Sequence, residues 1–254
     1  MTDFTLSEKQ RQALYRFGTD ERWLFLSGTV RSGKSYSLDL GWILWTQDEK
    51  TWPEPTDFII AGESVSAIRR NVLPQLEIFA NWFGIGWRFF ANGPYVQCGP
   101  HKYWIFGATK SDSADSIKGM TSGGAYLDEL TLMDEDFIAM VITRCSLPGA
   151  KLVGSTNPDI PMHFIKTDYI DRACSDRERA TQEDLLYGRH MEFGLDDNPV
   201  QDPDFVADMR RTLVGANYDR MFLGKWVANA GLVYPITLHP VSYTHLTLPT
   251  TPYV

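Results

Sequence analysis

The stretch Gly28-Thr29-Val30-Arg31-Ser32-Gly33-Lys34-Ser35 directly follows the apolar run Trp23-Leu24-Phe25-Leu26. Glycines at both ends of the octapeptide let backbone N–H groups turn inward, and a helix predicted from Lys34 to Thr46 would point its amino end at the same place. In a strand-loop-helix unit of this kind the lysine reaches the β- and γ-phosphates, and the serine ligates Mg²⁺. The octapeptide therefore predicts a nucleoside triphosphate site that extends from Gly28 to Ser35.

A second motif predicts a short buried strand that ends in two carboxylates. It is the stretch Gly123-Gly124-Ala125-Tyr126-Leu127-Asp128-Glu129. This is the layout of a Walker B strand, in which Asp128 would hold Mg²⁺. Glu129 points the other way and would orient and deprotonate the attacking water. An Asp-Glu pair is also common at strand ends, so the catalytic interpretation depends on the phosphate loop. Together the two motifs favour hydrolysis over phosphoryl transfer to an organic acceptor.

A third apolar run, Lys151-Leu152-Val153-Gly154-Ser155-Thr156-Asn157-Pro158, ends in hydroxyl and amide groups. Ser155, Thr156 and Asn157 would hydrogen-bond the lytic water or the γ-phosphate and transmit hydrolysis to a moving part. Asn before Pro also favours a turn, and both interpretations can hold at once.

Strand and helix patterns alternate along the chain, which predicts an α/β fold of the P-loop NTPase (RecA-like, ASCE) type with a mostly parallel central sheet. Three short β patterns in the middle predict antiparallel edge strands, and the run at Lys151 to Ser155 is expected to complete the sheet. The carboxyl ends of its strands would carry the loop, the carboxylates and the Ser155 segment. The expected helices are Glu8 to Phe17, Lys34 to Thr46, Ser64 to Trp82 and Asp134 to Cys145; the expected strands include Asp57 to Ala61, Trp87 to Phe90, Tyr95 to Gln97, Tyr103 to Phe106 and Arg189 to Gly194.

The composition limits the possible classes of function. A formal net charge of −8 argues against a protein that coats nucleic acid over its whole surface, although a single patch remains possible. Arg69-Arg70 and Arg210-Arg211 are the basic pairs available for phosphates, and each pair also fits a solvated helix face. Three separated cysteines fit a reduced cytoplasmic protein, and the five histidines show no zinc-ligand spacing. No secretory leader or membrane span is predicted.

Taken in order, these residues resemble the large terminase subunit of tailed bacteriophages, over about residues 5–235. Each mark is weak alone, but the order is specific. The marks are Arg31 inside the phosphate loop, Asp128-Glu129, Ser155-Thr156-Asn157-Pro158, Asp197-Asn198-Pro199, and the stretch Tyr218-Asp219-Arg220-Met221-Phe222-Leu223-Gly224-Lys225-Trp226 before Gly231-Leu232-Val233-Tyr234-Pro235.

The resemblance implies an ATPase that uses ATP and Mg²⁺ to package double-stranded DNA into a procapsid. It also implies a homo-oligomeric ring at the portal protein, a small terminase subunit as partner, no membrane, and the host cytoplasm as the location. Gln10 would lie near the adenine, whereas the residues alone mark only a polar helix start. Arg31 would contact the γ-phosphate or stabilise transition-state charge in cis, because a guanidinium suits phosphate oxygens.

Family members often carry an Arg-Gly shortly before the catalytic Glu, where the arginine acts on ATP of a neighbouring subunit. The matching dipeptide is Lys118-Gly119, which keeps the charge but loses the fork geometry. Arg144 is the alternative for this role in trans.

The expected domain division is an ATPase core at 1–175, a helical lid or linker subdomain at 176–235, and a third segment at 236–254. The last segment has no Lys, Arg, Asp or Glu and is rich in Thr and Pro. It is interpreted as a non-native tail, which resembles a translated adapter sequence, or as the truncated start of a nuclease domain with a Pro/Thr linker. The rival functions are a helicase or other DNA-dependent ATPase, and an ATP-dependent interaction module with little hydrolysis.

Overall fold

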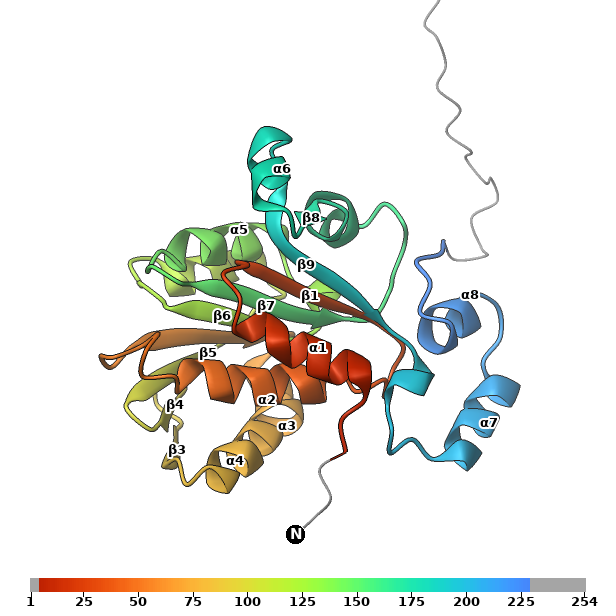
Figure 1. Ribbon diagram of the computed structural model, residues 1–254, viewed down its shortest axis with the longest axis horizontal. Helices are drawn as coiled ribbons and strands as arrows, with labels where there is room; N and C mark the ends of the chain where they lie inside the picture. The colour runs from red at the N-terminus through yellow and green to blue at the C-terminus, as the bar shows by residue number, and fades with distance from the viewer. Residues whose placement is uncertain (1–4, 229–254) are drawn as a thin grey trace, which may run out of the picture.

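The computed structural model describes residues 5–228, so the expected segment 236–254 and the stretch Gly231 to Pro235 lie outside the described residues. A nine-stranded sheet runs through the described part, in the order β3-β4-β5-β2-β6-β7-β1-β9-β8 (Figure 1). Its core is parallel, and β4 runs antiparallel to both of its neighbours. The predicted α/β class with antiparallel edge strands is therefore confirmed. The strands are β1 Trp23–Gly28, β2 Asp57–Gly62, β3 Trp87–Phe90, β4 Tyr95–Cys98, β5 His101–Gly107, β6 Gly124–Leu127, β7 Lys151–Thr156, β8 Ala173–Cys174 and β9 Leu186–Phe193.

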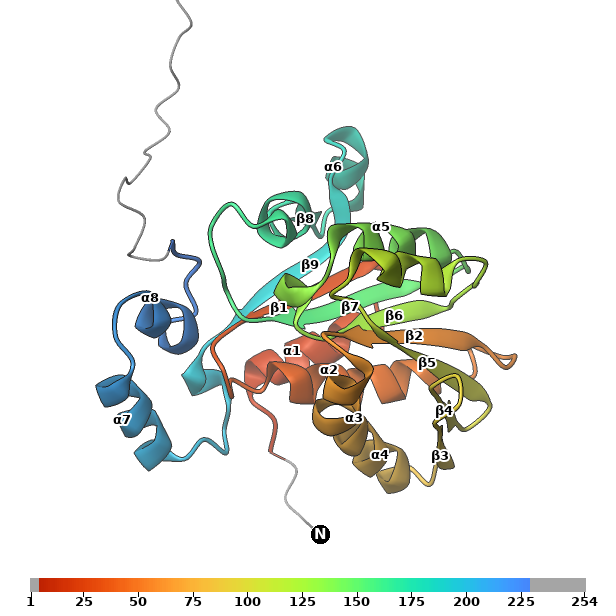
Figure 2. The same cartoon turned by 180° about the vertical axis from the view of Figure 1, so that it is seen from behind.

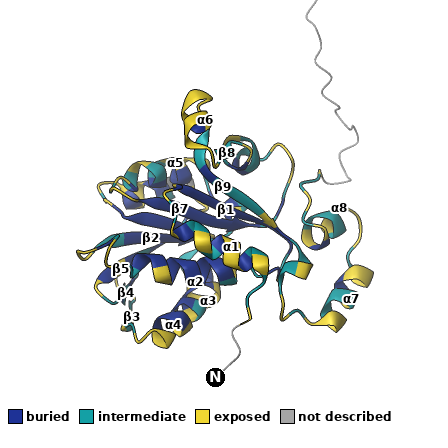
Figure 3. Ribbon diagram, viewed as in Figure 1, coloured by how far each residue is buried: buried dark blue, intermediate teal, exposed yellow. Residues whose placement is uncertain are grey.

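Helices cover both faces of this sheet. Helices α1 to α4 lie on one face, and Figure 2, from behind, shows α5 on the other. The central strands between the two layers are buried, whereas α6 and α7 are largely exposed (Figure 3). The helices are α1 Glu8–Phe17, α2 Lys34–Thr46, α3 Val65–Asn71, α4 Leu73–Trp82, α5 Glu135–Arg144, α6 Arg177–Gln182, α7 Pro203–Thr212 and α8 Gly215–Asn217, with short turns of other helix types at Ser111–Ile117, Leu130–Leu132, Ile165–Ile170, Leu195–Asp197 and Tyr218–Phe222.

Local signals explain where the helices begin. Ser7 and Gln10 form a reciprocal capping box at α1, and the Asp134 side chain accepts from two backbone N–H groups of α5. On the α1–α4 side, Trp42 of α2 is completely buried and its ring contacts Phe58 edge-on at 5.6 Å. This aromatic packing ties α2, and with it the phosphate loop, to the sheet.

The single helix expected from Ser64 to Trp82 is wrong, because two helices, α3 and α4, meet at Val72. Pro74 lies in the first turn of α4 and has no N–H to continue the hydrogen-bond ladder of α3. Proline fits well at the start of a helix, so the chain ends one helix and begins another.

The expectation that the strand at Lys151 to Ser155 completes the sheet is also wrong. β9 pairs in parallel with β1 on the side away from β7, and β8 pairs with β9. Glycine at position 188 allows this pairing, since a Cβ there would lie 2.3 Å from the Trp23 carbonyl oxygen. The division between domains at residue 176 stays a prediction, while the sheet itself continues through β9.

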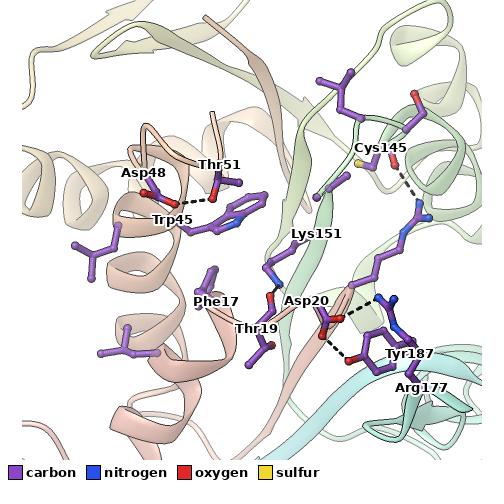
Figure 4. A pocket seen from close by; sticks show the side chains of 18 of the residues that line it. Phe17, Thr19, Asp20, Trp45, Asp48, Thr51, Cys145, Lys151, Arg177 and Tyr187 are labelled. Carbon is purple, nitrogen blue, oxygen red and sulfur yellow. Dashed lines mark hydrogen bonds and ion pairs between the residues drawn. The ribbon is translucent and has the colours of Figure 1, made fainter. Parts of the chain in front are cut away.

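A cavity of about 1080 Å³ lies at the amino ends of β1 and β7, at the opposite end of the sheet from the phosphate loop (Figure 4). Lys151 is buried beside it, and its Nζ donates to the carbonyl oxygens of Thr19 at 2.5 Å and Glu21 at 2.6 Å. Burial lowers the pKa of Lys151 to about 8, although the carboxylates of Glu21 and Asp20 raise it.

This buried lysine makes the stability depend on pH. The pKa of Lys151 in the folded state is below the unfolded value of about 10.4, so the unfolded chain binds the proton more tightly. The stability that neutral Lys151 contributes is therefore fully present above about pH 10.4 and is lost as the pH falls towards 8. We expect the free energy of unfolding of the native chain to rise by about 1–2 kcal/mol more than that of Lys151→Met between pH 7.5 and pH 9.5. Urea unfolding at the two pH values measures this difference, with Lys50→Met, at an exposed site, as the matched control. Equal pH dependence in the native chain and Lys151→Met would contradict it.

Candidate functional site

The loop between β1 and α2 has a backbone that only glycine adopts easily at two positions. Gly28 has φ +144°, and a Cβ on it would lie 1.9 Å from the carbonyl oxygen of Phe193 in β9. Gly33 has φ +87° and is the residue that caps the amino end of α2. The glycines therefore let the loop pass close to β9 and then turn into the helix.

Lys34 is buried inside this loop, with 6% of its surface exposed. Its Nζ donates to the carbonyl oxygens of Gly28 at 3.1 Å and Thr29 at 2.7 Å, and to Asn157 Oδ1 at 3.1 Å. Ser32 Oγ donates to the Thr29 carbonyl oxygen at 2.8 Å and holds the same turn. The lysine is thus surrounded by oxygen atoms at the carboxyl ends of β1 and β7.

Asn157 connects the lysine to the predicted catalytic carboxylate. Its Oδ1 accepts from Lys34, and its Nδ2 donates to Glu129 Oε1 at 3.0 Å. The neighbouring Ser155 Oγ donates to Asp128 Oδ1 at 3.0 Å. Five of the residues predicted from sequence therefore converge through side-chain contacts between β1, β6 and β7.

Burial sets the electrostatics of this cluster. It lowers the pKa of Lys34 to about 8, against the opposing influence of Glu129 and Asp128. Burial also raises the pKa of Asp128, and burial together with the Asp128 charge raises that of Glu129. Glu129 has φ +57°, a backbone conformation that costs energy for a residue with a side chain. The charges of Glu129 and Asp128 thus partly offset the cost of burying the Lys34 ammonium group.

A further carboxyl group lies behind the loop and was missed in the sequence. Asp39 lies one helical turn after Ser35 on α2, and Tyr126 Oη of β6 donates to its Oδ1 at 2.8 Å. Both side chains are buried, and burial raises the pKa of Asp39 well above its usual range. The spacing from Ser35 on the helix is the only sequence signal that pointed to it.

A pocket of about 370 Å³ lies beside the loop, and Ser35, which is exposed, is one of the residues that line it. Its walls come from residues 31–36 and from residues 198, 200, 201 and 202. Asn198 Nδ2 donates to the Arg31 carbonyl oxygen at 2.7 Å and to Gln201 Oε1 at 2.9 Å. Asn198 and Gln201 were not predicted as site residues; the Asn-Pro turn at Asn198 is the signal that marks this segment.

Three predicted residues make other contacts. The Arg31 guanidinium stacks 4.1 Å above the Phe205 ring of α7. Gln10 uses its Oε1 to accept from Ser7 N at 2.9 Å, and its amide lies against Gly33. Thr156 Oγ1 lies 2.9 Å from Thr131 Oγ1, in the turn that follows Glu129.

The cations considered for action in trans or for phosphate contact lie on the surface. Lys118 pairs with Asp115 at 2.5 Å. Arg144 ends α5, and its carbonyl oxygen accepts from Ser122 N at 2.9 Å, near the amino end of β6 and away from the loop. Arg69 stacks on Phe89 at 4.7 Å and Arg210 on Phe222 at 5.4 Å.

No described helix has both the length and the apolar composition that crossing a membrane requires.

Comparison with known proteins identifies the family. Residues 26–239 match the family model described as the N-terminal part of the T4likevirus-type terminase large subunit. A search of curated proteins by sequence returned no match.

Solved structures agree with the family model. The large terminase of a thermophilic bacteriophage is 28% identical, with a TM-score of 0.76, over 88% of this chain and 54% of that one. The same protein in complex with ADP matches with 28% identity and a TM-score of 0.76, over 87% and 54%. The large terminase of bacteriophage HK97 shares the fold at 16% identity and a TM-score of 0.63, over 87% and 51%. This chain thus spans about half the length of these large terminases. It belongs to the family of terminase large subunits, and it matches the N-terminal part of the T4likevirus type.

Proposed function

We propose that this chain is the ATPase motor domain of a phage terminase large subunit, which hydrolyses ATP to move double-stranded DNA into a procapsid. The observation that carries the proposal is the bridge that Asn157 makes between Lys34 and Glu129, 3.1 Å from one and 3.0 Å from the other. It joins the cation expected at the phosphates to the carboxylate expected at the attacking water.

The chain offers suitable groups for ATP and Mg²⁺. Ser35 and Asp128 are hard oxygen donors of the kind that Mg²⁺ prefers, and Mg²⁺ also takes substrate phosphate oxygens as ligands. Ser155 holds the Asp128 carboxylate in one orientation through its hydroxyl. The backbone of residues 28–33 and the amino end of α2 would receive the phosphates. The large terminase of the thermophilic bacteriophage has been solved with ADP and with ATP-gamma-S, which supports nucleotide binding in this chain.

Glu129 is the group that would take the proton from water. Its raised pKa makes it a better base than an exposed carboxylate, and the Asn157 amide fixes its Oε1. The Arg31 guanidinium contacts the Phe205 ring in this structure, and its role in cis stays a prediction. So do the adenine contact of Gln10 and the trans role of Lys118 or Arg144.

In this proposal Asn157 would also couple the chemistry to motion. A γ-phosphate that attracts Lys34 would withdraw it from Asn157 Oδ1, and the amide would then be free to turn at Glu129. Thr156, one residue earlier, contacts the turn after Glu129 through Thr131, so a shift in this segment would move two elements together.

The packaging role rests on the family. We infer that duplex DNA, the portal protein and a small terminase subunit are partners, in a homo-oligomeric ring in the host cytoplasm. The proposed division of the chain is an ATPase core at 1–175, a lid or linker subdomain at 176–235 and a third segment at 236–254. A helicase would need a second RecA-like half with its own motifs, and the described residues hold one such sheet.

The role of Glu129 can be tested by Mg²⁺-dependent ATP hydrolysis, with and without linear duplex DNA. We expect Glu129→Gln to lower kcat by about 10²–10⁴-fold while ATP binding persists, because the amide cannot accept a proton. Lys34→Ala should lose ATP binding, and Glu135→Gln, at an exposed site on α5, should behave as the native chain. Full turnover by Glu129→Gln would refute the assignment. Tight ATP binding without turnover by the native chain would favour the interaction module.

The bridging role of Asn157 has a separate test. Asn157→Leu should lower kcat by about 10–100-fold with ATP affinity changed less than about threefold, because Glu129 loses its orienting donor while the loop stays intact. Steady-state kinetics and nucleotide titration measure the two quantities, and Asn81→Leu on the exposed side of α4 is the matched control. A large loss of ATP affinity with unchanged kcat would show that Asn157 only supports binding.

A further inference from the structure

A hydrogen bond between two buried side chains joins helix α2 to strand β6 behind the phosphate loop. Tyr126 Oη donates to Asp39 Oδ1 at 2.8 Å. Tyr126 is completely buried, and only 3% of Asp39 is exposed. The Tyr126 ring also lies edge-on against Trp42 of α2, with 5.8 Å between the ring centres. This tyrosine therefore meets α2 through both its hydroxyl group and its ring.

A polar contact at this place is not what packing alone would select. An apolar pair of similar volume fills a core at least as well, because it does not lose the hydration of a carboxyl and a hydroxyl group. What a hydrogen bond adds is a fixed distance and direction between its two groups. The pair between α2 and β6 is therefore best explained by what it holds in place.

The residues next to this bond are the two that the proposed ATPase uses for Mg²⁺, Ser35 and Asp128, here called the Mg²⁺ candidates. Ser35 lies four residues before Asp39 on α2, and residues at this spacing share one face of a helix. Asp128 lies two residues after Tyr126, and residues at this spacing share one face of a strand. The Asp128 N–H donates to the Ala61 carbonyl oxygen at 2.8 Å, so the chain still follows the sheet at that position.

The two steps away from the bond are nearly equal in length and lead to the same end of the strands. Four residues of helix rise about 6 Å from Asp39 to Ser35, and two residues of strand extend about 6.6 Å from Tyr126 to Asp128. Helix α2 begins at the loop after β1, and β1 and β6 both run parallel to β7, which lies between them. The spacing of Asp39 and Tyr126 is therefore passed on to the Mg²⁺ candidates.

We propose that the hydrogen bond between Tyr126 and Asp39 is a brace that sets the distance between the two Mg²⁺ candidates and so preorganises them for the metal. This inference rests on the proposed function and adds two positioning residues to it, which act through Ser35 and Asp128. Mg²⁺ requires nearly ideal octahedral geometry at about 2.0–2.1 Å, so protein ligands that drift apart hold it less well. Changes to residues that orient metal ligands typically lower metal affinity by about 10–100-fold.

Binding of ATP-gamma-S to the full chain, in excess Mg²⁺ and in EDTA, tests the brace without any need for hydrolysis. Tyr126→Phe loses only the hydroxyl group, so the gain in affinity that Mg²⁺ gives should fall by about tenfold. The affinity of this variant in EDTA should match that of the native chain. Asp39→Leu should behave in the same way. Asp39→Asn keeps an oxygen that can accept from Tyr126, so it should retain most of the gain.

Tyr103→Phe is the matched control. Tyr103 is also completely buried, and its Oη lies 2.6 Å from Thr46 Oγ1 at the carboxyl end of the same helix. This variant loses an equivalent bond to α2 far from the Mg²⁺ candidates, so its gain from Mg²⁺ should match that of the native chain. Urea unfolding checks that each variant is folded. If Tyr126→Phe does not fold, the comparison of Asp39→Leu with Asp39→Asn decides the question.

Two results would overturn the brace alone: an unchanged Mg²⁺ effect in Tyr126→Phe, or an equal loss in Tyr126→Phe and Tyr103→Phe. An Asp39→Asn variant that loses as much as Asp39→Leu would also overturn it. A native chain that binds ATP-gamma-S equally with and without Mg²⁺ would instead refute the assignment of Ser35 and Asp128, and the brace with it. A Mg²⁺ effect that depends on Tyr126 in a chain without ATPase turnover would support the brace and refute the hydrolysis proposal.

Discussion

The site depends on a buried lysine that must be paired. A lone ammonium group away from water is costly, so the fold surrounds Lys34 with two loop carbonyl oxygens, the Asn157 amide oxygen and the charges of Glu129 and Asp128. Three parallel strands have to end at the same level to supply these partners. The strands β6, β7 and β1 are neighbours in the sheet and run parallel, so their carboxyl ends lie together and supply these partners.

In the proposed ATPase, the same network would join substrate binding to chemistry. Asn157 can satisfy Lys34 and Glu129 together only while both lie within hydrogen-bond distance. If ATP binds as proposed, a phosphate that competes for Lys34 would therefore alter the surroundings of the Glu129 carboxylate. The positive φ of Glu129 adds strain at this point, as occurs at sites where two arrangements have similar energies.

The two edges of the sheet, one near β9 and the other at β3, carry different features. Strand β9 crowds the phosphate loop through the Phe193 carbonyl oxygen and leads into the segment that supplies residues 198, 200, 201 and 202 to the pocket beside that loop. At the far end, the antiparallel strands β3 and β4 extend the sheet and carry aromatic rings with cations on them. Lys151 lies at the amino ends of the strands, where its burial lowers its pKa and makes the stability of the fold depend on pH.

The sequence by itself determined the α/β class, the phosphate loop, the paired carboxylates and most element boundaries, since apolar periodicity, glycines and caps act over a few residues. It also indicated Ser155 to Asn157 through their position at a strand end. Only the tertiary structure decided that β9 joins the sheet, that Asn157 bridges Lys34 and Glu129, that Asp39 meets Tyr126, and that Arg31 stacks on Phe205. These contacts join residues far apart in the chain, where pairing depends on packing and on the burial of charge rather than on local pattern.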